Sequence, residues 1–345
     1  MSIVLGLGFG DEGKGLTTSF LCSHTTNPLV VRFNGGHQVG HTVVYNNNRH
    51  VFSSFGSGTL QGVPTYWSKF CTVYPTAFLN EYKLLTKTTP LICVNPLCPV
   101  TTPYDIIIND RNESFNQHGS IGVGFGQTIE RHENNFFKLF VQDLFFENVL
   151  VAKLKNIATW YKLESVDISN FMSDCITMSH LIRLSDDNII HNYNPIFEGG
   201  QGILLDQSFG FFPNVTRSNT TSENALKLFN DTEVFYVTRT YQTRHGNGVM
   251  SNENDKLLIT NNEFETNQYN KYQGKFRVGE LDTSLMNYSL GCDNNFSIGL
   301  VKNLMITCCD QYHIDVDELL SKLGVTFNKV FLSYGNSLDD VIQYI

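Results

Sequence analysis

Short apolar runs that end at glycines or polar residues recur along this chain. Glycine-rich segments follow the stretches 2–8 (SIVLGLG) and 28–33 (PLVVRF). The stretch 194–206 has a glycine-rich segment at its centre. Runs of four to eight apolar residues bounded by glycine are typical of strands buried on both faces. We group with them the runs 90–96, 104–110, 233–241, 303–310 and 329–335, and expect the last to be the final strand.

Helical and hairpin patterns separate these runs. We expect a helix at 13–21, and residues 133–163 show helical periodicity with large aromatic residues on one face, which we interpret as core packing. The stretch 41–55 alternates like two strands joined by an asparagine-rich turn, and 247–273 is the most loop-like segment. This pattern predicts an α/β fold with an open, mostly parallel central sheet, whose ligands gather at the carboxyl ends of the strands.

Composition and charge bear on which kinds of binding partner the protein can have. The 345 residues are 41% hydrophobic and 17% charged, which is enough apolar surface for a packed core. The net charge is −9 and there is no long basic run, so we expect no nucleic-acid or membrane partner. No apolar run approaches eighteen residues and the N-terminus lacks a signal-peptide pattern, so we expect a cytoplasmic protein. The eight cysteines show no zinc spacing.

The first glycine-rich loop carries an unusual phosphate-binding pattern. Gly8, Gly13 and Lys14 have the spacing G-x-x-x-x-G-K, between a predicted strand and a predicted helix. Position 15 is glycine, where an ordinary NTPase loop has Ser or Thr for Mg²⁺, and Asp11 stands inside the loop. A carboxylate there repels phosphate unless it holds Mg²⁺ or works as a base. The loop therefore predicts a site that moves a phosphoryl group and takes a proton nearby.

A second glycine-rich segment, NGGHQVGHTV at 34–43, holds two histidines four residues apart. A zinc site is disfavoured because a helical H-x-x-x-H pattern would not contain these glycines. We expect His41 to neutralise the charge that develops on a transferring phosphoryl group.

Seven motifs resemble, in the same order, those of the adenylosuccinate synthetase family. They are GDEGKG (10–15), VVRFNGGHQVGHTVV (30–44), FGSGTL (55–60), FEGGQGILLD (197–206), FFPNVTRSNTT (211–221), TRHGNG (243–248) and VGELD (278–282). The resemblance implies one domain over residues 1–345, with helices on both faces of the sheet, a P-loop-like nucleotide site and an inserted helical segment around 130–190.

The resemblance also implies a reaction. A ligase of this family joins L-aspartate to carbon 6 of IMP, driven by GTP, through a 6-phosphoryl intermediate. By position in the motifs, Asp11 matches the base and a Mg²⁺ ligand, and the Gly40 carbonyl matches a second Mg²⁺ ligand. His41 matches the acid that stabilises the phosphoryl group, Lys14 the loop lysine, and Gln201 a glutamine near the purine.

Further positions match contacts to nucleotide or amino acid. Asp310 matches the aspartate that reads guanine, and Arg131 is loosely aligned with an arginine that reaches across a homodimer to a phosphate. Lys275 and Arg277 stand where the family has four arginines that grip the carboxylates of aspartate. The remaining expected nucleotide contacts are Gly13, Gly15, Asn34, Ser120, Thr216, His245 and Gly246.

Three alternatives stay open from the sequence. A viral branch of the family uses dGMP and makes a 2-aminoadenine precursor, in which case the chain would belong to a phage and act in the host cytoplasm. The usual members of that branch replace both acids that this chain keeps, Asp11 and Asp310. The other two alternatives are a non-catalytic GTP-binding protein and a P-loop NTPase switch, and the switch requires Ser or Thr at position 15.

Overall fold

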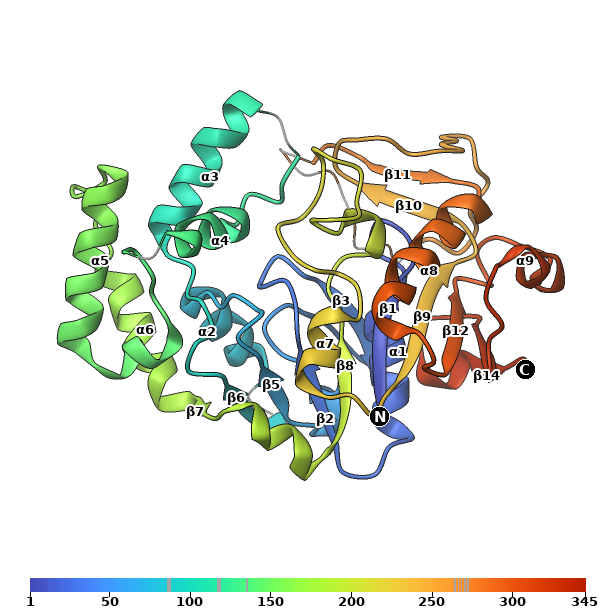
Figure 1. Cartoon of the computed structure of the whole chain (residues 1–345), viewed down its shortest axis with the longest axis horizontal. Helices are drawn as coiled ribbons and strands as arrows, with labels where there is room; N and C mark the ends of the chain where they lie inside the picture. The colour runs from blue at the N-terminus through green and yellow to red at the C-terminus, as the bar shows by residue number, and fades with distance from the viewer. Residues whose placement is uncertain are drawn as a thin grey trace.

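The computed structural model describes residues 1–85, 88–116, 119–134, 136–263, 265, 267, 269, 271 and 273–345. Within them, ten strands form one open sheet in the order β14-β13-β12-β9-β1-β8-β2-β5-β6-β7 (Figure 1). All neighbours pair in parallel except β13 and β14. The strands are β1 (Ser2–Gly6), β2 (Pro28–Arg32), β5 (Thr65–Trp67), β6 (Ile92–Val94), β7 (Arg183–Leu184), β8 (Asn194–Glu198), β9 (Glu233–Arg239), β12 (Lys302–Thr307), β13 (Lys329–Ser333) and β14 (Val341–Gln343).

Helices cover both faces of this sheet, because successive strand residues point to opposite sides. Ile3 and Leu5 of β1 join a core cluster with helices α7 (Glu223–Leu228), α8 (Thr283–Ser297) and α9 (Val316–Lys322). Val4, between them, packs in another cluster with Leu21 of helix α1 (Lys14–Ser23). The predicted α/β class and mostly parallel sheet are therefore confirmed.

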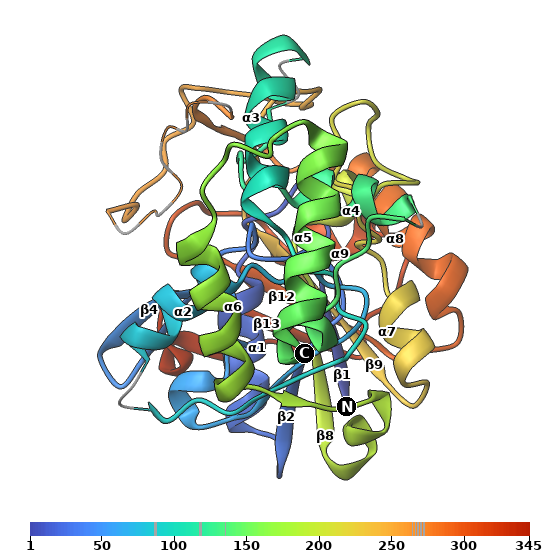
Figure 2. The same ribbon diagram turned by 90° about the vertical axis from the view of Figure 1, so that its left-hand side faces the viewer.

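A third core cluster lies at the other end of the molecule. It joins β5 and β6 to helices α2 (Pro75–Leu84), α5 (Glu147–Tyr161) and α6 (Ser169–Leu181). Helices α3 (Pro103–Asn116) and α4 (Phe125–Glu133) pack above them, and Figures 1 and 2 show all of these helices gathered beyond the β6 and β7 edge. The helical region between β6 and β7 thus begins before residue 130; the single-domain boundary stays a prediction.

Three predicted elements are corrected by the structure. The run 104–110, grouped with the strands, lies in α3, where three consecutive isoleucines hide the helical period. Only the second half of 133–163 is α-helical, as α5, and a 3-10 helix at Val141–Phe145 precedes it. The strand near the C-terminus, β13, is followed by one more, the antiparallel β14.

Two short antiparallel ribbons stand outside the main sheet. The predicted hairpin at 41–55 is confirmed as β3 (His41–Tyr45) and β4 (Asn48–Phe52). Strand β10 (Gln242–His245) pairs with β11 (Phe276–Gly279) across the loop-like segment predicted at 247–273. Both ribbons lie near the carboxyl ends of the central strands, where the glycine-rich loops also lie (Figure 1).

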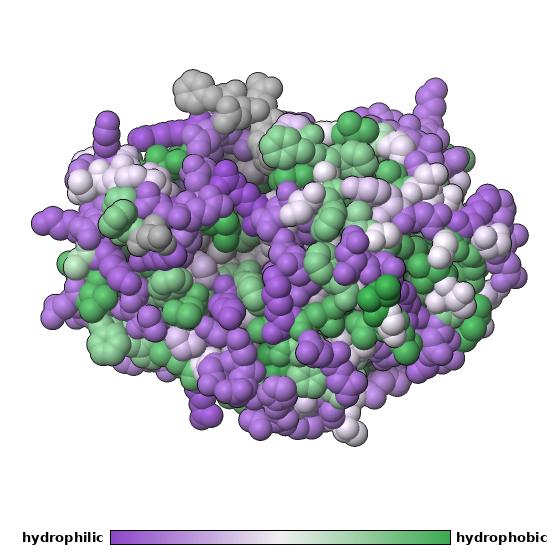
Figure 3. Space-filling view, viewed as in Figure 1, coloured by the Kyte–Doolittle hydropathy of each residue, from purple (hydrophilic) through white to green (hydrophobic). Residues whose placement is uncertain are grey.

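Polar and apolar side chains alternate over the visible surface (Figure 3), and the described helices are short or polar. On the face drawn in Figure 3, hydrophilic and hydrophobic side chains are interspersed. Among the described residues, no helix combines the length and the apolar character needed to cross a bilayer.

Candidate active site

The loop after β1 is held by side chains of neighbouring strands. Three consecutive main-chain carbonyls, at positions 10 to 12, each accept a hydrogen bond from the sheet. The donors are Thr243 Oγ1 (3.1 Å), Arg239 Nε (2.6 Å) and Thr307 Oγ1 (2.8 Å), in that order. The loop therefore has a defined shape at the start of α1, where unpaired amides and the helix dipole favour an anion.

Glu12 braces this loop from inside. Its Oε1 accepts hydrogen bonds from the N–H groups of Gly8 (3.0 Å) and Gly10 (2.9 Å), and its Oε2 lies 2.5 Å from Lys14 Nζ. A Cβ at Gly6 would lie 2.2 Å from the Glu12 carboxylate, so the glycine that ends β1 makes room for it. The sequence showed two acids in the loop but not that one of them pairs with the predicted phosphate-binding lysine.

Asp11 is the loop carboxylate whose side chain takes no part in bracing the loop. It has a left-handed backbone, with φ 64°, and accepts no hydrogen bond through its side chain from any residue that the structure describes. Burial raises the pKa of this carboxyl, and the nearby Arg239 opposes that rise only in part. Asp11 is only partly exposed, and an unpaired carboxylate in such surroundings gains stability from a proton or a cation, as a general base or a Mg²⁺ ligand does.

His41 forms a buried pair with Glu198. Its Nδ1 lies 2.8 Å from Glu198 Oε1, and the two side chains are 5% and 0% exposed. Burial lowers the pKa of His41, although Glu198 acts in the opposite direction. Burial alone would raise the pKa of Glu198, but His41 and Arg32 together hold it below its ordinary value. Glu198 also accepts a hydrogen bond from the Ser57 amide at 3.2 Å, so it anchors the FGSGTL loop.

Gly15 explains why the usual Ser or Thr is missing. A Cβ at this position would lie 2.9 Å from His41 Cβ and 3.0 Å from the Thr42 carbonyl oxygen. Both distances are tighter than almost any real contact. The first turn of α1 and the start of β3 therefore touch, and this contact brings His41 next to the phosphate-binding loop.

A second glycine-rich loop, after β8, packs on the first. A Cβ at Gly202 would lie 2.2 Å from the Gly8 carbonyl oxygen, so the two loops approach as closely as glycine allows. Its neighbour Gln201 has a left-handed backbone, with φ 53°, and its buried Oε1 has no hydrogen-bond partner. Strained backbone and an unpaired buried amide are features of ligand-contacting residues. Gln201 is thus placed beside the Asp11 loop.

Asn34 ties this arrangement together. Its Nδ2 donates to the carbonyls of Gly200 (3.2 Å) and Asn219 (3.0 Å), and its Oδ1 accepts from the Gly200 amide (2.7 Å). The side chain is 0% exposed. These bonds make Asn34 a brace between the loops after β2 and β8, and its expected nucleotide contact stays a prediction. Nearby Gln38, which sequence reasoning missed, has both amide atoms buried without a hydrogen-bond partner.

The loop between α3 and α4 meets the TRHGNG segment. A Cβ at Gly246 would lie 3.1 Å from the Gly119 carbonyl oxygen, so residues distant in sequence adjoin there. The Ser120 hydroxyl accepts from Asn109 Nδ2 at 3.1 Å, and His245 Nε2 lies 3.4 Å from the Gly274 carbonyl oxygen. Thr216 is only partly buried and donates its amide to the Leu205 carbonyl (2.8 Å).

The structure gives Arg131 partners within its own chain. Its guanidinium forms a two-point pair with Asp105 at 2.8 and 2.9 Å, and it also donates to the carbonyls of Phe137 and Val100. The side chain is 0% exposed. With these partners Arg131 braces α4 against α3, and its expected contact across a homodimer stays a prediction.

Replacement of Arg131 by methionine is expected to lower the free energy of unfolding by about 3–5 kcal/mol, because Asp105 is left buried without its counter-charge. Denaturant unfolding of the variant measures this loss. Arg217→Met is the matched control, since Arg217 is 46% exposed and its ion pairs lie at the surface. The control should change stability by less than about 1 kcal/mol, and a similarly small loss for Arg131→Met would contradict a bracing role.

The two cations expected to grip a dicarboxylate lie close together in sequence, Arg277 in β11 and Lys275 just before it. Arg277 pairs with Glu253 and Lys275 with Asp255. Arg277 lies directly opposite Arg244 on β10. Burial lowers the pKa of Arg244 to about 10, and the positive charge of the nearby Arg277 acts in the same direction. This buried guanidinium lies 4.2 Å from the centroid of the Phe9 ring in the first loop. Arg244 belongs to the TRHGNG motif, but it was not among the predicted site residues.

Asp310 follows β12 at the same edge of the sheet. Its Oδ1 is buried without a hydrogen-bond partner, while its main-chain carbonyl accepts from Thr260 Oγ1 at 3.1 Å. Burial raises the pKa of the Asp310 carboxyl. A carboxylate oxygen in this state is suited to accept hydrogen bonds from a base edge that offers two donors, as guanine does.

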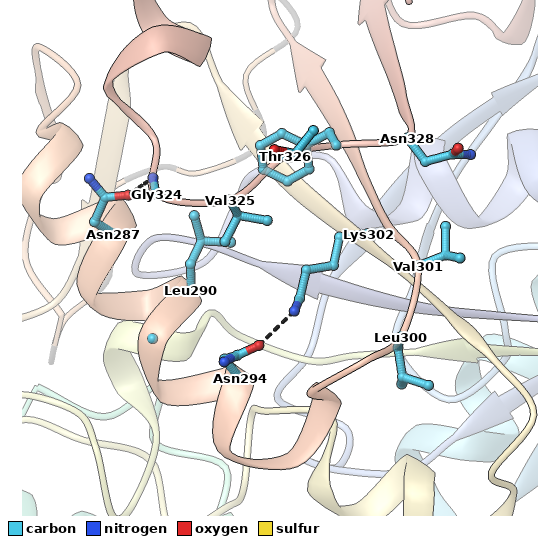
Figure 4. Close-up of a pocket in the computed structure, with 12 residues that line it drawn as sticks. Asn287, Leu290, Asn294, Leu300, Val301, Lys302, Gly324, Val325, Thr326 and Asn328 are labelled. Carbon is cyan, nitrogen blue, oxygen red and sulfur yellow. Dashed lines mark hydrogen bonds between the residues drawn. The ribbon is translucent and has the colours of Figure 1, made fainter.

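A pocket of about 690 Å³ lies away from these residues, between α8 and the segments that lead into β12 and β13 (Figure 4). Leu290, Val325 and Lys302 line it, and Lys302 Nζ donates to Asn294 Oδ1 at 2.6 Å. This is the amino end of the strands, opposite the glycine-rich loops. None of the predicted site residues lines it.

Comparison with known proteins identifies the family to which the chain belongs. Residues 3–319 match the family model described as "Adenylosuccinate synthetase". The chain is 29% identical over 310 residues to the adenylosuccinate synthetase of Picrophilus torridus, a match covering 84% of this chain and 73% of that one. It is 28% identical over 348 residues to that of Buchnera aphidicola, covering 90% and 80%.

Two solved structures share the fold. The fully ligated adenylosuccinate synthetase from Plasmodium falciparum has a TM-score of 0.84 at 17% identity, covering 100% of this chain and 99% of that one. The cyanophage S-2L succinoaminodeoxyadenylate synthetase (PurZ), bound to dGMP and dATP, has a TM-score of 0.74 at 14% identity, covering 99% and 94%. At these identities, the likeness establishes the architecture alone.

Proposed function

The chain belongs to the adenylosuccinate synthetase family and is a GTP-dependent ligase of that type, and we propose that it joins L-aspartate to carbon 6 of IMP. The observation that carries this proposal is the partly buried Asp11 carboxylate, which accepts no hydrogen bond from the described residues. It stands in a phosphate-binding loop against which His41 packs.

Asp11 acts as the general base in this proposal. It takes the proton from N1 of the purine, so that the electrons of the N1–H bond make O6 nucleophilic. O6 then attacks the γ-phosphorus of GTP, and GDP leaves. The amine of aspartate adds at carbon 6, and the 6-phosphoryl group departs as phosphate. A base with a raised pKa takes the purine proton more readily than an ordinary aspartate.

His41 supplies a positive hydrogen-bond donor to the phosphoryl group. Glu198 holds its Nδ1 side, which leaves Nε2 for the substrate. The pKa of His41 is lowered by burial, and an anionic phosphoryl group beside it favours the protonated ring again. The start of α1 adds partial positive charge for the nucleotide phosphates, and Lys14, paired with Glu12, lies in the same loop.

Mg²⁺ fits the donor set near the loop. Asp11 and the Gly40 carbonyl would hold it, and Gly40 is exposed. Among the described residues, no three His, Cys, Asp or Glu side chains gather as a metal cluster. That agrees with a cation which takes one or two protein oxygens and completes its shell with water and phosphate. When bound, Mg²⁺ neutralises charge on the phosphates of the nucleotide.

The acceptor is proposed as IMP because the curated relatives matched over most of the chain are adenylosuccinate synthetases. The chain also keeps both acids, Asp11 and Asp310, that set the usual members apart from the dGMP branch. A homodimer stays a prediction from the family resemblance, and Arg131, expected to reach across it, has internal partners.

A product assay tests the whole proposal. The protein is incubated with GTP, Mg²⁺ and L-aspartate, and IMP, GMP, dIMP and dGMP are offered separately. Mass spectrometry should show the succinyl adduct of IMP, with GDP and phosphate formed in equal amounts. An adduct with dGMP alone would reassign the acceptor. GTP hydrolysis without either co-substrate would indicate an NTPase instead.

Replacement of Asp310 by asparagine is expected to reduce the preference for GTP over ATP by at least about tenfold. The amide offers one acceptor and a donor where guanine needs two acceptors, and a lost charged hydrogen bond costs about 1.5–3 kcal/mol. The ratio of kcat/KM for the two nucleotides measures this change. An unchanged ratio would remove Asp310 from nucleotide recognition.

A further inference from the structure

The two cations proposed for the amino-acid substrate already contact carboxylates of the chain. Lys275 Nζ lies 2.6 Å from Asp255 Oδ2. Arg277 Nε and Nη2 lie 2.8 and 2.5 Å from the two carboxylate oxygens of Glu253. The cations are two residues apart and so are the acids. The chain therefore presents two carboxylates to the pair of cations, as a dicarboxylic amino acid does.

Both acids come from a short segment, residues 251–255, that runs beside β11. The Asn254 amide donates to the Val278 carbonyl at 3.0 Å, and Glu253 forms an antiparallel bridge with Gly279. This pairing holds Glu253 beside β11, where it meets Arg277. Asp255 and Lys275 lie just outside the paired residues and contact each other there.

The two ion pairs differ in how tightly they are held. Arg277 also donates to the carbonyls of Gly246 (3.2 Å) and Gly248 (2.8 Å), and its side chain is 16% exposed. A substrate carboxylate would have to break a two-point pair and compete with two carbonyl contacts. Lys275 and Asp255 are 62% and 63% exposed. An exposed pair of this kind contributes little and exchanges readily.

We propose that Asp255 is a built-in competitor for the amino-acid substrate at Lys275, whereas Arg277 remains bound to Glu253 and positions the loop. This inference rests on the proposed function. A carboxylate of the incoming amino acid takes the place of Asp255 on the Lys275 ammonium, and Asp255 moves into water. Asp255 thereby sets the concentration of amino acid at which the site fills.

Asp255→Asn tests this competition. The variant should lower KM for L-aspartate by about two- to fivefold, the range that an exposed ion pair supports. Neither kcat nor KM for the purine nucleotide should change. In a Lys275→Met background, the same substitution should have no effect on KM, because the contested cation is gone.

Glu318→Gln is the matched control. Lys322 and Glu318 form an ion pair of the same length, 2.6 Å, with side chains 53% and 62% exposed, on α9. This variant should leave KM for aspartate unchanged. An unchanged or higher KM in Asp255→Asn would overturn the competition. An equal decrease in the Lys275→Met background would also overturn it, because the effect would then be general charge.

The same experiment separates the two proposals. If the wild-type protein forms no succinyl product with any of the four nucleotides, the proposed function fails and the competition falls with it. If product forms and KM for aspartate is the same in wild type and Asp255→Asn, only the competition fails.

Discussion

Replacement of Asp11 by asparagine is expected to lower kcat by about three orders of magnitude or more, while GTP still binds. The amide has nearly the same shape but cannot take the purine proton, and a positioned general base contributes about 10²–10⁴ in rate. Loss of a Mg²⁺ ligand adds to this effect. The decrease is measured as succinyl product formed per enzyme at saturating substrates.

Binding of GTP to the Asp11 variant is the necessary companion measurement. The loop keeps its shape because Glu12, Thr243 and Thr307 hold it through contacts that do not involve the Asp11 side chain. Titration calorimetry should therefore give a Kd within a few-fold of wild type. A variant that binds GTP normally and retains a tenth of the wild-type rate would exclude Asp11 as the base.

Replacement of His41 by asparagine is expected to lower kcat by about two to three orders of magnitude. The amide fits the site but carries no positive charge for the phosphoryl group, and removal of one such donor costs about 10²–10³ in kcat. KM for both nucleotides should change much less, because the contact strengthens as the phosphoryl group transfers.

Glu198→Gln provides the comparison for His41. Glutamine keeps the size of Glu198 and can still accept a hydrogen bond, but it does not stabilise a positive imidazole. We expect a smaller loss than for His41→Asn, and the double variant should be no slower than His41→Asn alone. Losses that multiply in the double variant would show that the two residues act separately.

The parallel sheet was predictable because its strands are continuous apolar runs that end at glycine. The prediction fails where the spacing of apolar residues suggests one kind of element and the surroundings of the segment favour another. Ile106, Ile107 and Ile108 look like a buried strand, yet they lie in α3, whose start at Pro103 is capped by reciprocal hydrogen bonds between Thr102 and Asp105. The short strands β10 and β11 are separated by about thirty residues, and no local pattern pairs them.

The candidate site was predictable as a set of loops but not as a set of contacts. The motifs identified Asp11, His41 and Gln201, and the structure brings their loops together. Motifs do not show which acid pairs with which cation, so the pairing of Glu12 with Lys14 and the contact of Arg239 with the loop were not predicted. They also cannot distinguish an exposed arginine from an internal one, as Arg131 demonstrates.

The contact between Gly15 and the start of β3 sets a limit on how this protein can change. A hydrolytic NTPase needs a hydroxyl side chain at residue 15, and here that volume is taken by the backbone and Cβ of the His41 segment. A single substitution at 15 cannot restore the hydroxyl without displacing the histidine. Conversion between these two chemistries therefore requires coordinated change in two segments, so neither lies one mutational step from the other.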